Sequence, residues 1–217
     1  METSSSPVLR LRITFAKTAA MRYSGHLDLH RTWERTFRRA GLPLAYSQGF
    51  NPHPRLNLAS ALPLGFTSQE EVLDAWLEQD LPLSEVQAAL ENALPPGLRL
   101  VQIEREDLGA TALQTELKAS DYLVTFIEPI PELETRAQEV LATQKLVRLR
   151  RKKEYDLRPL ILGLEVLPVD EQGNPRLSMR LKACEGATGR PDEVLEAMGA
   201  DPLCARIERK RLHFDRD

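Results

Sequence analysis

The residues best suited to chemistry in this chain gather in one stretch, residues 21–66. Three of the four histidines lie there, and the same stretch contains a loop rich in polar and turn-forming side chains. Gly49 can adopt a positive φ, Asn51 can close an Asx turn, and backbone N–H groups exposed by such turns can hold an anion. We predict a ligand-binding loop made of Tyr46, Ser47, Gln48, Gly49, Phe50, Asn51 and His53. A rigid structural turn would use the same residue types, so the sequence leaves both readings open.

General acid–base chemistry is a second possibility for this stretch. A partly buried His26 beside Tyr46, Ser47 and His53 could move protons near neutral pH, so His26 is the candidate catalytic residue. No nucleophile motif, phosphate-binding P-loop or dinucleotide fingerprint accompanies it. The pattern therefore favours a protein that binds over one that catalyses.

A metal site is the third possibility. His26 and His30 are four residues apart on a predicted helix, and His53 follows on the next loop, so two imidazoles could meet one ion. Asp28, however, points to another side of that helix. Cys184 and Cys204 are too few and too isolated to ligate an iron–sulfur cluster. We expect no metal and no cofactor to be held by this chain.

Nucleic-acid binding is indicated by two clusters of basic residues. At 100° per residue, the predicted helix turns Leu29, Trp33 and Phe37 to one side and its arginines to the other. The candidate nucleic-acid-binding residues are Arg31, Arg35, Arg38 and Arg39 of this helix, and Lys145, Arg148, Arg150, Arg151, Lys152, Lys153 and Arg158 of the second half. Such side chains neutralise phosphates and release counterions. The alternative is an ordinary solvated face, with acidic neighbours such as Glu34 and Glu154 pairing some of the arginines.

Charge is distributed unevenly along the 217 residues. Residues 1–60 hold 9 Lys and Arg against 3 Asp and Glu, residues 61–139 hold 4 against 16, and residues 140–217 hold 16 against 13. Basic charge is therefore concentrated towards the two ends, which a net charge of −3 conceals. No leader segment and no apolar run near 18 residues is visible, so we expect a soluble cytoplasmic protein with no membrane partner.

The spacing of apolar residues predicts an α+β protein built from two similar halves. Strands are expected at 9–15, 55–60, 71–78, 98–104, 122–127, 145–153, 160–167, 176–183 and 205–214, and helices at 25–40, 84–94, 133–141 and 191–198. The first half then follows the order β-α-β-β-α-β, which is that of a ferredoxin-like fold with an antiparallel sheet, and we interpret the second half as a repeat of this pattern. We predict tandem ferredoxin-like halves at 1–106, which holds the motif segment 21–66, and at 121–217, joined by a linker at 107–120.

Several short motifs resemble one known family. They are YSGHLD at 23–28, ERTFRRAGLPL at 34–44, YSQGFNP at 46–52, LPLG at 62–65 and YDLRP at 155–159. Together they resemble the radical-SAM-linked family of uncharacterised bacterial proteins, whose domain also occurs fused to cobalamin-binding radical-SAM proteins. The resemblance implies work beside a radical-SAM enzyme. That enzyme would act in trans, because no C-x-x-x-C-x-x-C cluster motif is present here. His30 stands where the family more often has an apolar residue.

The predicted fold order also resembles that of CRISPR repeat-processing endoribonucleases. The glycine-rich loop of those enzymes is missing near the C-terminus, where Gly186 and Gly189 are a poor substitute, so no nuclease activity is carried over. The sequence favours an accessory protein that binds RNA or presents a substrate to a radical-SAM enzyme, with RNA modification as the process and tRNA or rRNA as the partner. An enzyme using His26 and loop 46–53 on RNA, and a protein–protein adaptor, remain the alternatives.

Overall fold

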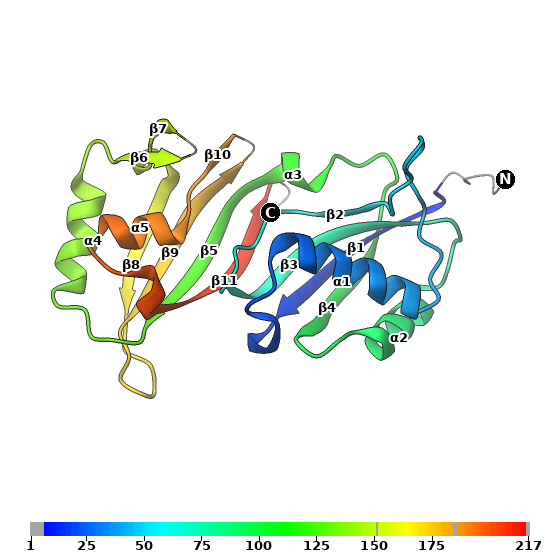
Figure 1. The fold of residues 1–217 in the computed structure, drawn as a ribbon, viewed down its shortest axis with the longest axis horizontal. Helices are drawn as coiled ribbons and strands as arrows, with labels where there is room; N and C mark the ends of the chain where they lie inside the picture. The colour runs from blue at the N-terminus through cyan, green and yellow to red at the C-terminus, as the bar shows by residue number, and fades with distance from the viewer. Residues whose placement is uncertain (1–6, 151, 185, 216–217) are drawn as a thin grey trace. The chain divides into compact units, whose positions relative to one another are not determined.

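The computed structural model describes residues 7–150, 152–184 and 186–215. The fold is mixed α+β, with mostly antiparallel strands and few helices (Figure 1). The chain divides into two compact units, unit 1 at Met1–Thr115 and unit 2 at Glu116–Asp217. In the part of the chain that the structure describes, no helix combines the length and apolar character needed to cross a bilayer.

Unit 1 is an antiparallel sheet with two main helices. Its elements are β1 (Leu9–Lys17), η1 (Ala19–Met21), α1 (His26–Arg39), β2 (Leu56–Leu58), β3 (Thr67–Leu77), α2 (Leu83–Ala93) and β4 (Leu98–Glu106). The strand pairings give the order β4-β1-β3-β2, every pair being antiparallel. The short helix α3 (Leu113–Glu116) follows β4.

The core of unit 1 forms where the helices cover the sheet. On β1, Leu11, Ile13 and Phe15 are fully buried, as the alternating pattern predicts. They pack in one cluster with α1 residues such as Trp33 and with the buried α2 residue Leu90. The predicted amphipathic character of both helices is confirmed by this burial.

Unit 2 also has an antiparallel sheet and two main helices. Its elements are β5 (Leu117–Phe126), α4 (Leu133–Ala142), β6 (Val147–Arg150), β7 (Lys153–Asp156), η2 (Arg158–Leu160), β8 (Ile161–Leu167), β9 (Arg176–Cys184), β10 (Ala187–Thr188), α5 (Pro191–Ala197), η3 (Pro202–Cys204) and β11 (Ala205–Phe214). The main strands lie in the order β8-β9-β5-β11. The short β10 pairs with the end of β9.

Two predicted segments differ from the structure. Residues 145–153 do not form one strand; they include β6 and the first residue of β7, and these two strands pair with each other as a separate hairpin. A single strand and a tight hairpin have the same alternation of side chains, so the pattern alone cannot separate them. β5 begins at Leu117, inside the range expected as a linker.

A buried ion-pair network joins β1 to β3. Arg10 is 1% exposed and its Nε donates to Asp74 Oδ2 over 3.1 Å, while Arg12 Nε donates to Asp74 Oδ1 over 3.0 Å. Further donor atoms of Arg10 bond the backbone carbonyls of Asp107 and Thr111. The network therefore ties the segment after β4 to the centre of the sheet.

We predict that Asp74→Ala destabilises unit 1 strongly. Removing this carboxylate leaves Arg10 buried and without its ionic partner, a change that typically costs about 3–5 kcal/mol. Both tryptophans, Trp33 and Trp76, lie in unit 1, so urea unfolding followed by tryptophan fluorescence reports on this unit.

The control is Asp80→Ala. Asp80 pairs with Arg105 over 2.7 Å at the surface, with exposed side chains, and losing such a pair costs less than about 1 kcal/mol. Equal effects of the two substitutions would contradict a structural role for the buried network.

Candidate functional site

Helix α1 is oriented by the aromatic residues that it buries. The Trp33 ring stands edge-on to Phe15 of β1, with the ring centres 4.9 Å apart, and the ring centres of Trp33 and Phe37 are 6.1 Å apart. At the N-terminus, the Gly25 N–H donates to Asp28 Oδ2 over 3.2 Å. At the other end, Gly41 has a φ of 69°, which suits glycine and ends the helix. Because these contacts fix the rotation of α1, its arginines must face outward.

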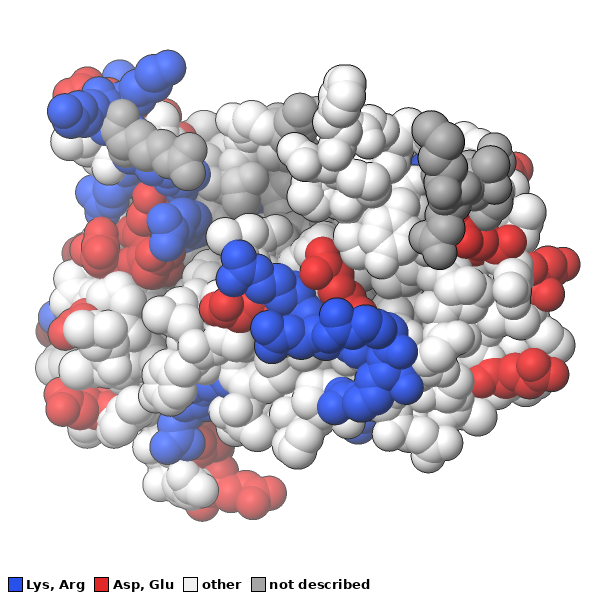
Figure 2. All heavy atoms as spheres, turned by 45° about the vertical axis from the view of Figure 1, so that its right-hand side comes forward, with Lys and Arg blue, Asp and Glu red and all other residues white. Residues whose placement is uncertain are grey.

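Among the described residues, no other side chain bonds three of those arginines. Arg31, Arg35 and Arg38 are exposed, and within the described part of the chain their guanidinium groups make no ion pair or hydrogen bond. Arg39 differs, because its Nη2 donates to the carbonyl of Ala93 at the end of α2. Figure 2 shows Lys and Arg side chains gathered in a band across one face, with acidic side chains beside it. The sequence-predicted stripe therefore separates into three unpaired arginines and one that joins two helices.

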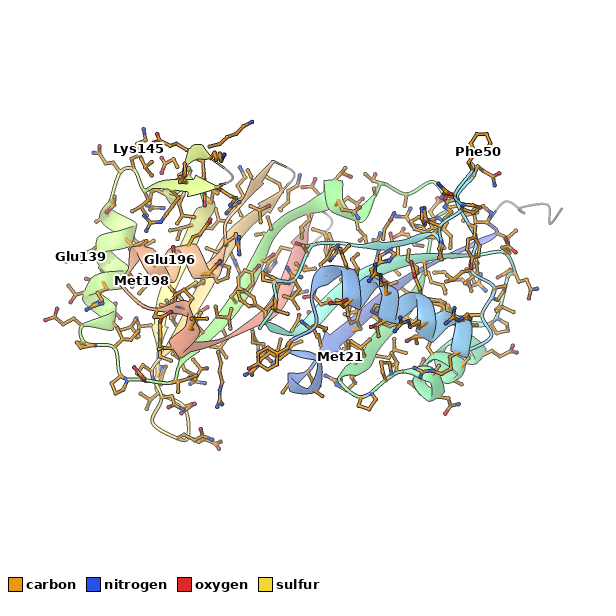
Figure 3. The ribbon with its side chains drawn as sticks, viewed as in Figure 1. Met21, Phe50, Glu139, Lys145, Glu196 and Met198 are labelled. Carbon is orange, nitrogen blue, oxygen red and sulfur yellow. The ribbon has the colours of Figure 1, made fainter. Side chains whose placement is uncertain are left out.

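The predicted binding loop is a narrow projection with a closed base. Tyr46 and Pro54 form an isolated bridge, and the Ser47 N–H donates to the His53 carbonyl over 2.8 Å. The His53 N–H in turn donates to Ser47 Oγ over 3.0 Å. Phe50, at the tip, is fully exposed and points away from the rest of unit 1 (Figure 3).

The base of this loop and the arginines of α1 line one groove of about 530 Å³. Its lining residues are Arg31, Glu34, Arg35 and Arg38 from α1, Leu42, Pro43 and Leu44 from the segment after it, and Tyr46 and Pro54 from the loop. Tyr46 is 45% exposed, so its ring is available to a ligand. The groove thus combines unpaired positive charge on one wall with apolar and aromatic surface on the other.

The structure brings together only some of the residues predicted for this site. Of the seven loop residues, Tyr46 lines the groove, whereas Ser47, Gln48, Gly49, Phe50, Asn51 and His53 do not. Leu42, Pro43, Leu44 and Pro54 were not predicted. The position of this segment depends on the backbone bridge between Leu44 and Leu77. It also depends on the hydrogen bond that the Ala45 N–H donates to the Trp76 carbonyl over 2.8 Å. Those long-range contacts have no local sequence signal.

The histidines lie outside the groove lining. His26 is at the first residue of α1, whereas the groove begins near Arg31, more than one turn later. His30 contacts Glu34, with 3.1 Å between Nδ1 and Oε1, and its Nε2 lies 3.1 Å from the Leu56 carbonyl oxygen. Among the described residues, no three His, Cys, Asp or Glu side chains gather as metal ligands would.

The second basic cluster surrounds the β6–β7 hairpin of unit 2. Lys145, Lys152 and Lys153 are exposed there, and Lys145 projects outward in Figure 3. Arg148 is partly buried, with Nη1 3.3 Å from the carbonyl oxygen of Val147. Arg151 lies outside the described residues.

The two remaining arginines of this cluster bond within unit 2. Arg158 donates to the carbonyls of Leu141 and Ile161, over 3.0 Å in each case. Arg150 Nε donates to Glu193 Oε1 over 3.2 Å, and its guanidinium lies 4.7 Å from the centre of the Tyr155 ring. The Tyr155 hydroxyl also donates to Glu193. Both arginines therefore hold the hairpin region against the rest of unit 2.

A second concavity of about 390 Å³ lies in unit 2 and was not predicted. Asp121 of β5 lines it, and accepts from Arg180 Nε over 2.7 Å. His213 Nε2 lies 2.8 Å from the other oxygen of Asp121. Partial burial acts to raise the pKa of Asp121, but the hydrogen bonds from Arg180 and His213 outweigh it and hold the pKa below its ordinary value. Asp121, Arg180 and His213 lie on three different strands and far apart in the sequence, so no local sequence pattern indicates this cluster.

We predict that Tyr155 ionises far above the ordinary range. Burial, together with the hydrogen bond and the negative charge of Glu193, raises the pKa of Tyr155 from 10.0 to about 12. The phenol form is favoured by folding, so its contribution to stability is complete below pH 10 and is lost as pH rises towards 12. Ultraviolet absorbance of the phenolate, as the difference between the parent and Tyr155→Phe, measures this titration.

Glu193→Gln provides the matched comparison. It removes the charge that disfavours the phenolate while keeping the shape of the side chain, so the Tyr155 titration should move to lower pH. Ionisation of Tyr155 at its ordinary pH in the parent would contradict the Arg150–Glu193–Tyr155 arrangement.

Two solved structures are similar to this chain at low sequence identity. The chain aligns with a chain of "Crystal Structure of a Cbf5-Nop10-Gar1 Complex" at 11% identity and a TM-score of 0.49, covering 93% of this chain and 48% of that one. A chain of "Structure of H/ACA RNP bound to a substrate RNA containing 2'-deoxyuridine" aligns at 11% identity and a TM-score of 0.46, covering 94% of this chain and 47% of that one. The chain thus spans about half the length of these solved chains. No curated protein sequence matches it.

The family comparison covers most of the chain. Residues 10–191 match the model described as "Uncharacterized protein conserved in bacteria (DUF2344)". The matched range includes α1, the loop, the groove and the β6–β7 hairpin. The chain belongs to this bacterial family, DUF2344.

Proposed function

We propose that this protein binds single-stranded RNA segments through the groove of unit 1, and presents them as an accessory protein in RNA modification. The observation that supports it is the meeting of three unpaired arginines with an exposed tyrosine on one groove. Unpaired guanidinium groups attract phosphates and release their counterions. Aromatic rings stack on unpaired bases, each stack worth about 1–3 kcal/mol.

The chemistry of the groove favours RNA over a simple anion. A bare phosphate would use the arginines but not the apolar wall formed by Leu42, Pro43 and Tyr46. A nucleotide has an anionic phosphate and a flat base, and so matches both walls. The exposed lysines of the β6–β7 hairpin, Lys145, Lys152 and Lys153, offer further phosphate contacts in unit 2.

We also propose a protein partner for the chain and a specific fold for each unit. The motif resemblance supports a radical-SAM enzyme as the partner, with tRNA or rRNA as the nucleic acid. For the fold, we propose a βαββαβ ferredoxin-like unit in each half, with β6–β7 as an insertion in the second. The antiparallel strand orders β4-β1-β3-β2 and β11-β5-β9-β8 support this proposal.

We predict that Arg35→Glu weakens binding of single-stranded RNA about tenfold or more. The change removes one charged contact, worth about 1.5–3 kcal/mol, and adds a repulsive carboxylate. The slope of log affinity against log salt should also become shallower, by about 0.7 for each lost phosphate contact. Fluorescence anisotropy with a labelled oligonucleotide at two or more salt concentrations measures both quantities.

Arg99→Glu is the matched control. Arg99 is exposed on β4, does not line the groove, and undergoes the same change of charge. Equal affinity of Arg35→Glu and Arg99→Glu for RNA would refute the groove as the binding site. Lys153→Glu tests the hairpin more cleanly than Arg150→Glu, because Arg150 bonds Glu193 and its loss would disturb the fold.

For the partner, we predict that the tagged chain co-purifies from its host with a protein that contains a C-x-x-x-C-x-x-C motif. Mass spectrometry identifies the captured proteins, and nuclease treatment before capture separates direct association from bridging by RNA. Recovery of RNA with no such protein would leave the RNA proposal standing and refute the partnership.

A further inference from the structure

Glu34 is the one carboxylate among the residues that line the groove. It lies on α1 between Arg31 and Arg38, yet no ion pair joins it to any of the three groove arginines in the part of the chain described. Its carboxylate instead contacts His30, one turn earlier, at 3.1 Å between Oε1 and Nδ1. The other oxygen, Oε2, has no partner among the described residues.

His30 holds this carboxylate in place. The far side of the imidazole, Nε2, lies 3.1 Å from the Leu56 carbonyl oxygen of β2. The ring is thus fixed between the sheet and the helix, and Glu34 is kept from folding onto the arginines. Because Oε2 of Glu34 has no partner among the described residues, it can accept a hydrogen bond from a ligand without first breaking an ion pair with an arginine.

A carboxylate in a phosphate-binding groove repels phosphate, so it must face another part of the ligand. In a nucleotide, the groups that can donate to a carboxylate are the ribose 2′-hydroxyl and the N–H groups on the edge of the base, which is accessible in unstacked RNA. Of these, only the N–H groups of the base differ in number and position from one base to another, so only they let a carboxylate in the groove select a base.

We propose that the groove selects guanine, with Glu34 as the residue that determines the choice. The proposal rests on the groove being the RNA site. Guanine presents two parallel donors, N1–H and the 2-amino group, that match the two oxygens of a carboxylate. Adenine and cytosine present one amino group each, and uracil one imide N–H.

The arginines reinforce this choice. Guanine also offers the acceptors O6 and N7, to which arginine commonly donates two hydrogen bonds. A guanine base could therefore meet Glu34 on one edge and an arginine such as Arg31 or Arg35 on the other, with a face on Tyr46. Cytosine can donate to Glu34 but lacks the O6 and N7 acceptor pair of guanine.

The test uses four five-nucleotide RNAs, UUGUU, UUAUU, UUCUU and UUUUU, in direct binding to the full chain. The parent protein should bind UUGUU about tenfold more tightly than the other three, since a bidentate base contact contributes discrimination of this order. Glu34→Gln should reduce the preference to less than about threefold, and its affinity for UUUUU should rise because a negative charge is removed from the groove.

Glu91→Gln is the control with the same chemical change. Glu91 is exposed on α2, where it accepts from Gln87 over 2.9 Å, and this variant should keep the guanine preference of the parent. His30→Ala should lower the preference while its circular dichroism spectrum stays that of the parent, which separates a positioning role from loss of the fold.

The results separate the two proposals. If the four RNAs bind equally, or UUCUU binds best, and Arg35→Glu still weakens binding, the RNA function stands and guanine selection is refuted. If Glu34→Gln keeps the preference, Glu34 is not the selecting residue. If no RNA binds to the folded parent protein, both proposals fail.

Discussion

The groove depends on the burial of one face of α1. Trp33 and Phe37 are almost fully enclosed, and Trp33 packs edge-on against Phe15 of β1. Burying side chains of this size contributes several kcal/mol, far more than any preference of an exposed arginine for one direction. The core therefore decides the rotation of the helix. The arginines, spaced at three and four residues along the opposite side, follow from it as one row.

The chain uses its arginines in two different ways. Arg10, Arg150 and Arg158 each bond carboxylates or carbonyls within their own unit, and so stabilise the fold. The three groove arginines have no such partners in the described chain, although like charges so close together on one helix repel. That repulsion is a cost to the free protein which a bound anion would relieve. Composition and net charge count every arginine in the same way, so they cannot distinguish an arginine that stabilises the fold from one that lines the groove.

The local patterns of the sequence were sufficient for most of the helices and strands and for the two faces of α1. The expected final strand, 205–214, is β11, and the buried residues of α1 are those that the helical period selects. Local patterns were not sufficient to predict the groove, because Tyr46 and Leu44 are positioned by backbone bridges to Pro54 and Leu77. The hairpin at 147–156 was missed because its turn lacks the usual Asn-Gly or Gly signal; Lys152 takes a φ of 66° there.

Glu34 shows how one residue can reverse its meaning between sequence and structure. In the sequence it is an acidic neighbour able to pair an arginine of the stripe, which argues for an ordinary solvated face. In the fold, His30 draws Oε1 to within 3.1 Å and the arginines stay unpaired. A helix that only needed solubility would lower its energy by pairing these charges, since i,i+4 pairs stabilise it by about 0.2–0.5 kcal/mol each. Keeping both signs apart in one groove is consistent with a ligand that has an anionic part and a hydrogen-bond-donating part.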